Sequence, residues 1–429
     1  MAIVLAKSKE ISPARLAASR ILQQVETGAF SSILLAAEEP RLQPVDRALC
    51  HELVLGVLRR QLFLDRIAEY FSKRPVDSLD PPVRIALRLG LYQLRFLTRV
   101  PASAAVNESV SLVRAARLSS ATAFVNAVLR SAIREAEYDP AANVSDPLER
   151  IAVQTSHPAW LIERWANQFG IEETEAFARA NNTVPRTAFR VVKMRAKEVD
   201  VVAKMKDAGA TLEASQIVKG AWRVSGATSL LRELSAAGEI YLQDEASQLA
   251  ADVVEAFNGD LVLDLCAAPG GKTTLMADRA GGYAGIVAAD RSAARLATVA
   301  ATAELHWSEN IWPVVLDATQ PLPFPRESFN RVLVDAPCSG TGTLRANPEI
   351  RWRLAPGDFG NFASQQKRIL SRAVEVLMPR GRLVYSTCSV EREENEEVIQ
   401  GIDLKLMKTI RTWPQRDGTD GFFMAIFEK

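Results

Sequence analysis

Residues 261–273 read Leu261-Val-Leu-Asp-Leu-Cys-Ala-Ala-Pro-Gly-Gly-Lys-Thr273, and this stretch decides the fold of the C-terminal half of the chain. Its first six residues form a short apolar run that is typical of a buried strand, and the glycines that follow predict a turn into a helix. A second apolar run, over residues 285–290, is again followed by a helical stretch. Because strands that alternate with helices pair in parallel through right-handed crossovers, the pattern predicts a mostly parallel sheet.

The same alternation continues towards the C-terminus. Strands are predicted over residues 311–316, 331–334, 382–387 and 421–427, and a long helix over residues 359–377. Residues 236–429 are therefore expected to form an α/β, Rossmann-like domain with helices on both faces of the sheet.

The N-terminal part of the chain has a different pattern. Apolar residues recur at helical spacing, and Ser12-Pro13 is typical of an N-cap followed by proline at the first helical position. We expect an all-α bundle over residues 1–140. Several prolines after this bundle predict a linker, and weaker strand and helix patterns after the linker predict a small α+β module. The linker and the module together cover residues 141–235.

The composition excludes several classes of protein. The chain has 429 residues, of which 48% are hydrophobic and 24% are charged, and this ordinary globular composition excludes long disorder and a disulfide scaffold. There is no run of about 18 apolar residues and no sign of a leader peptide, so we expect a cytoplasmic protein without a membrane partner. The cysteines are widely spaced and the three histidines are isolated, so no metal site is expected. A monomer is expected.

Ligands of an open parallel sheet bind beyond the carboxyl ends of its strands, and that rule selects candidate site residues. Four aspartates and three of the four cysteines fall at predicted strand ends, namely Asp264, Cys266, Asp290, Asp317, Asp335, Cys338 and Cys388. The alternative is that these cysteines are buried structural thiols, although a core cysteine more often lies mid-strand or on a helix.

The glycine turn after the first strand could serve several ligands. A phosphate-binding Walker loop needs a glycine where Cys266 stands, and the dinucleotide fingerprint is absent. The alternating small residues after Asp264 match the adenosine-binding turn of methyltransferases, in which the backbone approaches the ligand closely. Asp290 can accept both ribose hydroxyls, and Asp317 can accept from the adenine amino group or merely cap its own loop. Together these features favour S-adenosylmethionine.

The residues expected to bind S-adenosylmethionine are Cys266, Ala267, Ala268, Pro269, Gly270, Gly271, Lys272, Asp290, Asp317 and Asp335.

Two cysteine motifs make the chain recognisable. They are Asp335-Ala-Pro-Cys-Ser-Gly-Thr-Gly342 and Tyr385-Ser-Thr-Cys-Ser389, and residues 347–352, 393–396 and 420–423 also match. With these motifs the chain resembles the RNA 5-methylcytosine methyltransferases of the NOL/NOP/sun class over nearly its whole length. Its N-terminal bundle is similar to the NusB family, through Asp46-Arg47 and Phe124-Val-Asn-Ala-Val-Leu129. This fusion points to the group that acts on small-subunit ribosomal RNA.

The resemblance implies both the reaction and the roles of its residues. It implies S-adenosylmethionine-dependent methylation of carbon 5 of a specific cytosine in 16S ribosomal RNA, through a covalent bond between a cysteine and the cytosine. It assigns the attack to Cys388, release of the product adduct to Cys338, and a contact with the base to Asp335. The spacing of the two cysteines does not by itself say which of them attacks.

Small-subunit ribosomal RNA is accordingly the expected partner. Residues 1–140 carry 19 Lys and Arg against 14 Asp and Glu, and 16 of these cations are arginines, whose forked guanidinium suits phosphate. The candidates for RNA contact are Arg15, Arg20, Arg59 and Arg60, and solvent-facing charge without a partner is the alternative for each. Two other functions stay open: a non-catalytic RNA-assembly factor, and a nucleotide hydrolase that uses Lys272.

Overall fold

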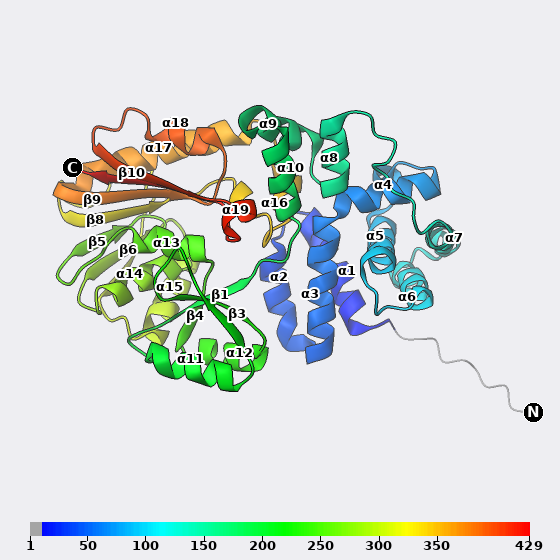
Figure 1. The fold of residues 1–429 in the computed structure, drawn as a ribbon, viewed down its shortest axis with the longest axis horizontal. Helices are drawn as coiled ribbons and strands as arrows, with labels where there is room; N and C mark the ends of the chain where they lie inside the picture. Colours follow the sequence, from blue (N-terminus) through cyan, green and yellow to red (C-terminus); the bar gives the residue numbers. More distant parts are fainter. Residues whose placement is uncertain (1–10) are drawn as a thin grey trace, which may run out of the picture. The chain divides into compact units, whose positions relative to one another are not determined.

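The computed structural model describes residues 11–429, which form two compact units (Figure 1). The first, here called the helical unit, comprises the described residues up to Thr183 together with Leu344–Arg353. The second, here called the sheet unit, comprises Val184–Thr343 and Leu354–Lys429. Across the described residues no helix is long and apolar enough to cross a membrane. The extreme N-terminus, where the absence of a leader was predicted, lies outside the described residues.

The helical unit confirms the predicted all-α bundle. Its α-helices are α1 (Pro13–Glu26), α2 (Ser31–Glu38), α3 (Pro44–Arg59), α4 (Gln61–Ser72), α5 (Pro81–Phe96), α6 (Ala102–Ala115), α7 (Thr122–Arg134), α8 (Pro147–Thr155), α9 (Ala159–Phe169), α10 (Ile171–Ala180) and α16 (Ile350–Arg353), with short 3-10 turns η1 (Glu39–Arg41), η2 (Val76–Ser78) and η3 (Ser119–Ala121). Leu53, Leu64 and Leu129 are fully buried in its core. Within a helix such as α7, the buried residues recur at helical spacing and form the apolar face that the sequence indicated.

The predicted linker is helical instead. Pro147 is the first residue of α8, where Asp146 accepts a hydrogen bond from the backbone N–H of Glu149, and Pro158 is the N-cap of α9. Proline is well tolerated at a helix start because its missing N–H would have no partner there. The two compact units divide the chain at residue 183, and residues 344–353 return to the first unit.

The sheet unit begins with the predicted α+β module. A four-stranded antiparallel sheet has the order β2-β3-β1-β4, formed by β1 (Thr187–Val191), β2 (Thr211–Ala214), β3 (Ala221–Ser225) and β4 (Ile240–Leu242). The helices α11 (Glu198–Asp207) and α12 (Thr228–Ala236) belong to the same module. Phe189, Val201 and Ile240 are buried together in its core.

The predicted Rossmann-like domain is a seven-stranded sheet of order β10-β11-β9-β8-β5-β6-β7. Its strands are β5 (Leu261–Asp264), β6 (Gly285–Asp290), β7 (Ile311–Val315), β8 (Phe329–Asp335), β9 (Leu377–Thr387), β10 (Lys405–Thr412) and β11 (Phe422–Glu428). β5 to β9 pair in parallel, whereas β11 pairs antiparallel with both β9 and β10. The helices around it are α13 (Glu245–Asp252), α14 (Gly271–Arg279), α15 (Ala293–Leu305), α17 (Asp358–Val376), α18 (Glu396–Ile399) and α19 (Pro414–Asp417), with the 3-10 turns η4 (Thr341–Thr343) and η5 (Arg392–Glu394).

Helices cover both faces of this sheet, as predicted (Figure 1). Val262 on β5 packs with side chains of α14 and α15, whereas its neighbour Leu263 belongs to the cluster that contains α17. Successive side chains of a strand point to opposite faces, so a strand covered on both sides must be apolar throughout. This is why β5 appears in the sequence as a continuous apolar run.

Candidate active site

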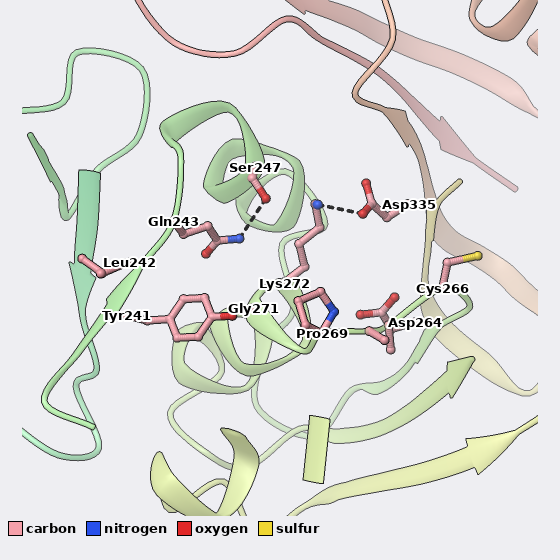
Figure 2. A pocket seen from close by; sticks show the side chains of 12 residues that line it. Tyr241, Leu242, Gln243, Ser247, Asp264, Cys266, Pro269, Gly271, Lys272 and Asp335 are labelled. Carbon is pink, nitrogen blue, oxygen red and sulfur yellow. Dashed lines mark hydrogen bonds and ion pairs between the residues drawn. The ribbon is translucent and has the colours of Figure 1, made fainter. Parts of the chain in front are cut away.

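The carboxyl ends of the parallel strands form two neighbouring pockets in the sheet unit. One, of about 220 Å³, is lined by the loop after β5 together with Tyr241, Gln243, Ser247 and Asp335 (Figure 2). The other, also of about 220 Å³, is lined by Asp290, Asp317, Cys338 and Cys388 among others. Cys266, Ala268 and Asp335 line both pockets.

Every predicted catalytic and cofactor residue except Gly270 lines one of these pockets. Gly270 instead lets the loop turn tightly into α14. Its φ of +107° suits glycine, and a Cβ there would lie 3.1 Å from the backbone of Val299 on α15. The structure thus brings together residues that lie up to about 120 positions apart in the sequence.

The two cysteines at the ends of β8 and β9 are adjacent. Their sulfur atoms, Cys338 Sγ and Cys388 Sγ, lie 3.2 Å apart. The hydrogen bond to Cys388 and burial raise the pKa of Cys338 well above its usual range. Burial also raises the pKa of Cys266, with Asp264 adding to the effect, so the Cys266 thiol is protonated at neutral pH and is a poor nucleophile.

Asp335 sits between the pockets with both carboxylate oxygens engaged. Lys272 Nζ donates to Oδ2 at 2.7 Å, and Ser386 Oγ donates to Oδ1 at 2.8 Å. Figure 2 shows the Lys272 ammonium pointing towards this carboxylate. Burial lowers the pKa of Lys272, but the ion pair with Asp335 outweighs it and raises this pKa overall. Lys272 is therefore charged at neutral pH.

The two outer aspartates make local contacts as well as lining the pocket. Asp290 Oδ1 accepts from the backbone N–H of Ser292 at 3.0 Å, and Oδ2 lies 3.5 Å from the Arg295 guanidinium. Asp317 Oδ1 accepts from the N–H and the hydroxyl of Thr319, and these hydrogen bonds lower the pKa of Asp317. Asp317 thus caps its loop, the alternative that the sequence had left open, while it also lines the second pocket.

The sequence did not identify Tyr241, Gln243 and Ser247 as site residues. They come from the end of β4 and the start of α13, and Gln243 Nε2 donates to Ser247 Oγ at 3.0 Å (Figure 2). Gln243 Oε1 is buried and accepts no hydrogen bond from the described residues. No periodicity or composition marks this short connection, so only the three-dimensional structure places it at the pocket.

Residues of the α+β module contact the glycine loop and the start of α14. The guanidinium of Arg190 on β1 donates to Thr274 Oγ1 at 2.9 Å, and burial lowers the pKa of Arg190 to about 10. Gly271 leaves room for the Tyr241 ring, since a Cβ there would lie 2.6 Å from it. The start of α14 is therefore held between β1 and β4.

The residues present fit S-adenosylmethionine. The first amides of α14 lack acceptors within the helix and favour a carboxylate, while Asp290 at the next strand end suits ribose hydroxyls. Two buried acceptors without partners among the described residues, Gln243 Oε1 and Asp264 Oδ1, are compatible with donors such as an amino group. The two pockets that share Cys266 and Ala268 can accommodate the two ends of such a molecule.

The four predicted RNA-binding arginines all belong to the helical unit, and their surroundings differ. Arg15 is buried, with Nε donating to Gln93 Oε1 at 2.7 Å, and Arg59 is buried with two donors on the carbonyl of Arg345. The guanidinium groups of Arg15 and Arg59 are buried and hydrogen-bonded within the protein, and this argues against a contact with RNA by either residue. Arg20 is exposed on α1, and Arg60 is half-buried over the Phe96 ring.

Comparison with known proteins identifies the family. Three family models match: the 16S rRNA methyltransferase RsmB/F over residues 251–408, the NusB family over 12–134, and an RsmF/B-like ferredoxin-like domain over 157–230. The chain is 31% identical to the probable ribosomal RNA small subunit methyltransferase B of Bacillus subtilis, over 98% of this chain and 99% of that protein. It is 36% identical to the corresponding Synechocystis protein, over 85% and 82% respectively.

A solved structure agrees with the sequence comparison. The crystal structure of PH0851 superposes with a TM-score of 0.84 at 27% identity, and the match covers 98% of this chain and 99% of that one. The fold, the pockets and the relatives therefore converge, and the chain belongs to the ribosomal RNA small subunit methyltransferase B family.

Proposed function

We propose that this chain methylates carbon 5 of a specific cytosine in 16S ribosomal RNA through a covalent Cys388–cytosine intermediate. The chain is a ribosomal RNA methyltransferase that uses S-adenosylmethionine. The observation that supports the finer proposal is the pair of thiols 3.2 Å apart beside Asp335. A methyltransferase acting on a nucleophilic nitrogen or oxygen would need neither thiol.

The chemistry explains why a thiol is needed. Carbon 5 of cytosine is a poor nucleophile, but a thiolate that adds to carbon 6 converts the ring into an enamine. S-adenosylmethionine, when bound, supplies an electrophilic methyl group, which carbon 5 attacks. The proton on carbon 5 then passes to a base, the S–C6 bond breaks, and its electron pair returns to the sulfur of Cys388.

The neighbouring residues divide the remaining tasks. Asp335, held by Lys272 and Ser386, is placed to hydrogen-bond the cytosine edge. Lys272 also interacts electrostatically with Cys388. Cys338 is the group we assign to release of the adduct, as the base that takes the carbon 5 proton. Its pKa is raised first by the hydrogen bond to Cys388, an interaction with the free sulfur that ends once Cys388 is bonded to carbon 6. Arg20 and Arg60 remain our candidates for phosphate contacts, which position RNA without specifying its sequence.

Labelled methyl transfer to unmodified 16S ribosomal RNA tests the proposal. Cys388→Ala should abolish transfer while S-adenosylmethionine still binds, whereas Cys338→Ala should accumulate a covalent protein–RNA adduct on denaturing gels. Cys50→Ala is the matched control, because Cys50 is buried in the helical unit and should leave both readouts unchanged. Normal turnover of Cys388→Ala would refute the nucleophile.

Calorimetry distinguishes the alternative functions. Binding of S-adenosylmethionine without any methyl transfer to RNA would favour an RNA-assembly factor. Binding of ATP in place of S-adenosylmethionine would favour a nucleotide hydrolase that uses Lys272.

A further inference from the structure

The loops that carry the two site cysteines meet on one buried carboxylate, that of Glu394 at the end of η5. Oε2 accepts from the backbone N–H of Ser339 at 2.8 Å and from Gln366 Nε2 at 3.0 Å. Oε1 accepts from Ser389 Oγ at 2.7 Å and from the hydroxyl of Ser339. Ser339 follows Cys338 in the chain, and Ser389 follows Cys388.

The next residue reinforces the second loop. Asn395 Oδ1 accepts from Thr387 Oγ1 at 2.5 Å, and Asn395 Nδ2 donates to the carbonyl of Ser389 at 2.9 Å. Cys388 is therefore held between two anchored neighbours. The two loops also contact each other directly, since the hydroxyl oxygens of Ser339 and Ser389 lie 3.1 Å apart.

Fold stability alone is a weak explanation for this arrangement. The four donors are an amide, a carboxamide and two hydroxyls, all of them neutral, and a buried carboxylate without a cation is expensive. Burial raises the pKa of Glu394 accordingly. A single carboxylate offers, however, two acceptor oxygens that reach both loops at once, which no hydroxyl could do.

We propose that Glu394 is a positioning residue that holds Cys338 against Cys388, so that the methylated product is released from the enzyme. The inference rests on the proposed covalent function and adds a role for a residue that touches neither substrate nor cofactor pocket. The negative charge of Glu394 also contributes to the raised pKa of Cys338.

Glu394→Gln in the full-length chain tests this role. The amide keeps the shape but turns one acceptor into a donor that faces other donors. We expect the covalent RNA adduct to form at the wild-type rate in a single turnover, its decay to slow at least tenfold, and multiple-turnover methylation to fall by the same factor. Affinity for S-adenosylmethionine should not change. Glu397→Gln is the matched control, since Glu397 is half-exposed near Arg392, and it should behave as wild type.

A double-mutant cycle with Cys338→Ala separates positioning from a merely structural effect. If Glu394 acts through Cys338, the double variant should release its adduct no more slowly than Cys338→Ala alone. Multiplicative slowing, or wild-type release by Glu394→Gln, would overturn the proposal. If Glu394→Gln fails to fold, Ser389→Ala replaces it, because it removes one donor to Glu394 and keeps the charge. Slow decay would again support the role and normal decay would refute it.

The same experiment distinguishes this inference from the function on which it rests. If neither the wild-type protein nor Cys338→Ala ever forms an adduct, the covalent function itself fails. If the wild-type protein turns over and Cys338→Ala accumulates the adduct, but Glu394→Gln releases its product at the wild-type rate, the covalent function is supported and the positioning role of Glu394 is refuted.

Discussion

At the scale of single residues, Asp264 shows how the site shifts the pKa of a carboxyl group. It ends β5 fully buried, with Oδ2 accepting from Thr273 Oγ1 at 2.7 Å. Burial raises the pKa of Asp264 to about 7, and the charge of Asp335 adds to the shift. The unfolded chain ionises such a carboxyl near pH ~3.9. The folded state thus holds a proton that the unfolded state lacks between these two values, so the free energy of unfolding falls as the pH rises towards 7.

Asp264→Asn should remove this pH dependence. Its amide oxygen can still accept from Thr273, but no charge has to be buried above pH 7. The total effect is on the order of 4 kcal/mol, from about three pKa units at roughly 1.4 kcal/mol each. Thermal unfolding between pH 5 and 8 should show a flatter profile for Asp264→Asn and a higher Tm at pH 8 than wild type. Asp317→Asn is the control, because its lowered pKa lies outside this window. An unchanged slope in Asp264→Asn would contradict the assignment.

At the scale of elements, most strands of the large sheet were predictable, including the exposed edge strand β7, but the other edge strand, β10, was not. The apolar runs of β5, β6 and β9 matched their predictions because parallel strands must be apolar on both sides. β10 was missed, since most of its residues are exposed at the sheet edge and carry no apolar pattern. At the site, the glycine loop and both cysteines were visible in the sequence. The segment 393–396 was noted as part of the family resemblance, but the contacts of Glu394 could not be predicted, because its partners come from loops up to about 55 positions away.

The contact between α14 and β4 provides a test at the same scale. Gly271→Ala should raise the helix propensity of α14 by up to about 1 kcal/mol. Its Cβ would, however, lie 2.6 Å from the Tyr241 ring, and overpacking of this kind costs about 1–3 kcal/mol. We expect the steric effect to win, so that the Tyr241 ring shifts into the pocket of Figure 2 and the affinity for S-adenosylmethionine falls about tenfold in calorimetry. The double variant Gly271→Ala/Tyr241→Ala should recover part of the lost affinity for S-adenosylmethionine. If Gly271→Ala bound S-adenosylmethionine with the wild-type Kd, the Tyr241 ring would be able to move away from the new Cβ without disturbing the pocket, which would contradict this prediction.

At the scale of the whole molecule, the two compact units are not continuous segments of the sequence. Residues 344–353 lie between two parts of the sheet unit in sequence but belong to the helical unit. There Glu349 Oε1 accepts from the N–H and the hydroxyl of Ser31, and Trp352 Nε1 donates to the carbonyl of Leu58. These partners are about 300 residues away, so no local pattern could reveal them. The chain therefore passes between the two units three times, which a linear division into domains cannot represent.

Arg351 is the buried anchor of that segment and allows the independence of the two units to be tested. Its guanidinium donates to the carbonyl of Ser156 at 3.1 Å and to Asn182 Oδ1 at 3.0 Å, and burial lowers its pKa to about 9, so it is still charged at neutral pH. Arg351→Met would leave buried acceptors unpaired, which should destabilise the helical unit by about 3 kcal/mol or more. Scanning calorimetry should show its transition at a lower temperature, while the affinity for S-adenosylmethionine stays within about twofold, because the pocket residues all lie in the sheet unit. Arg372→Met, which removes only a half-exposed pair with Glu375, should shift neither. A loss of cofactor affinity in Arg351→Met alone would show that the helical unit shapes the active site through the segment that follows Thr343.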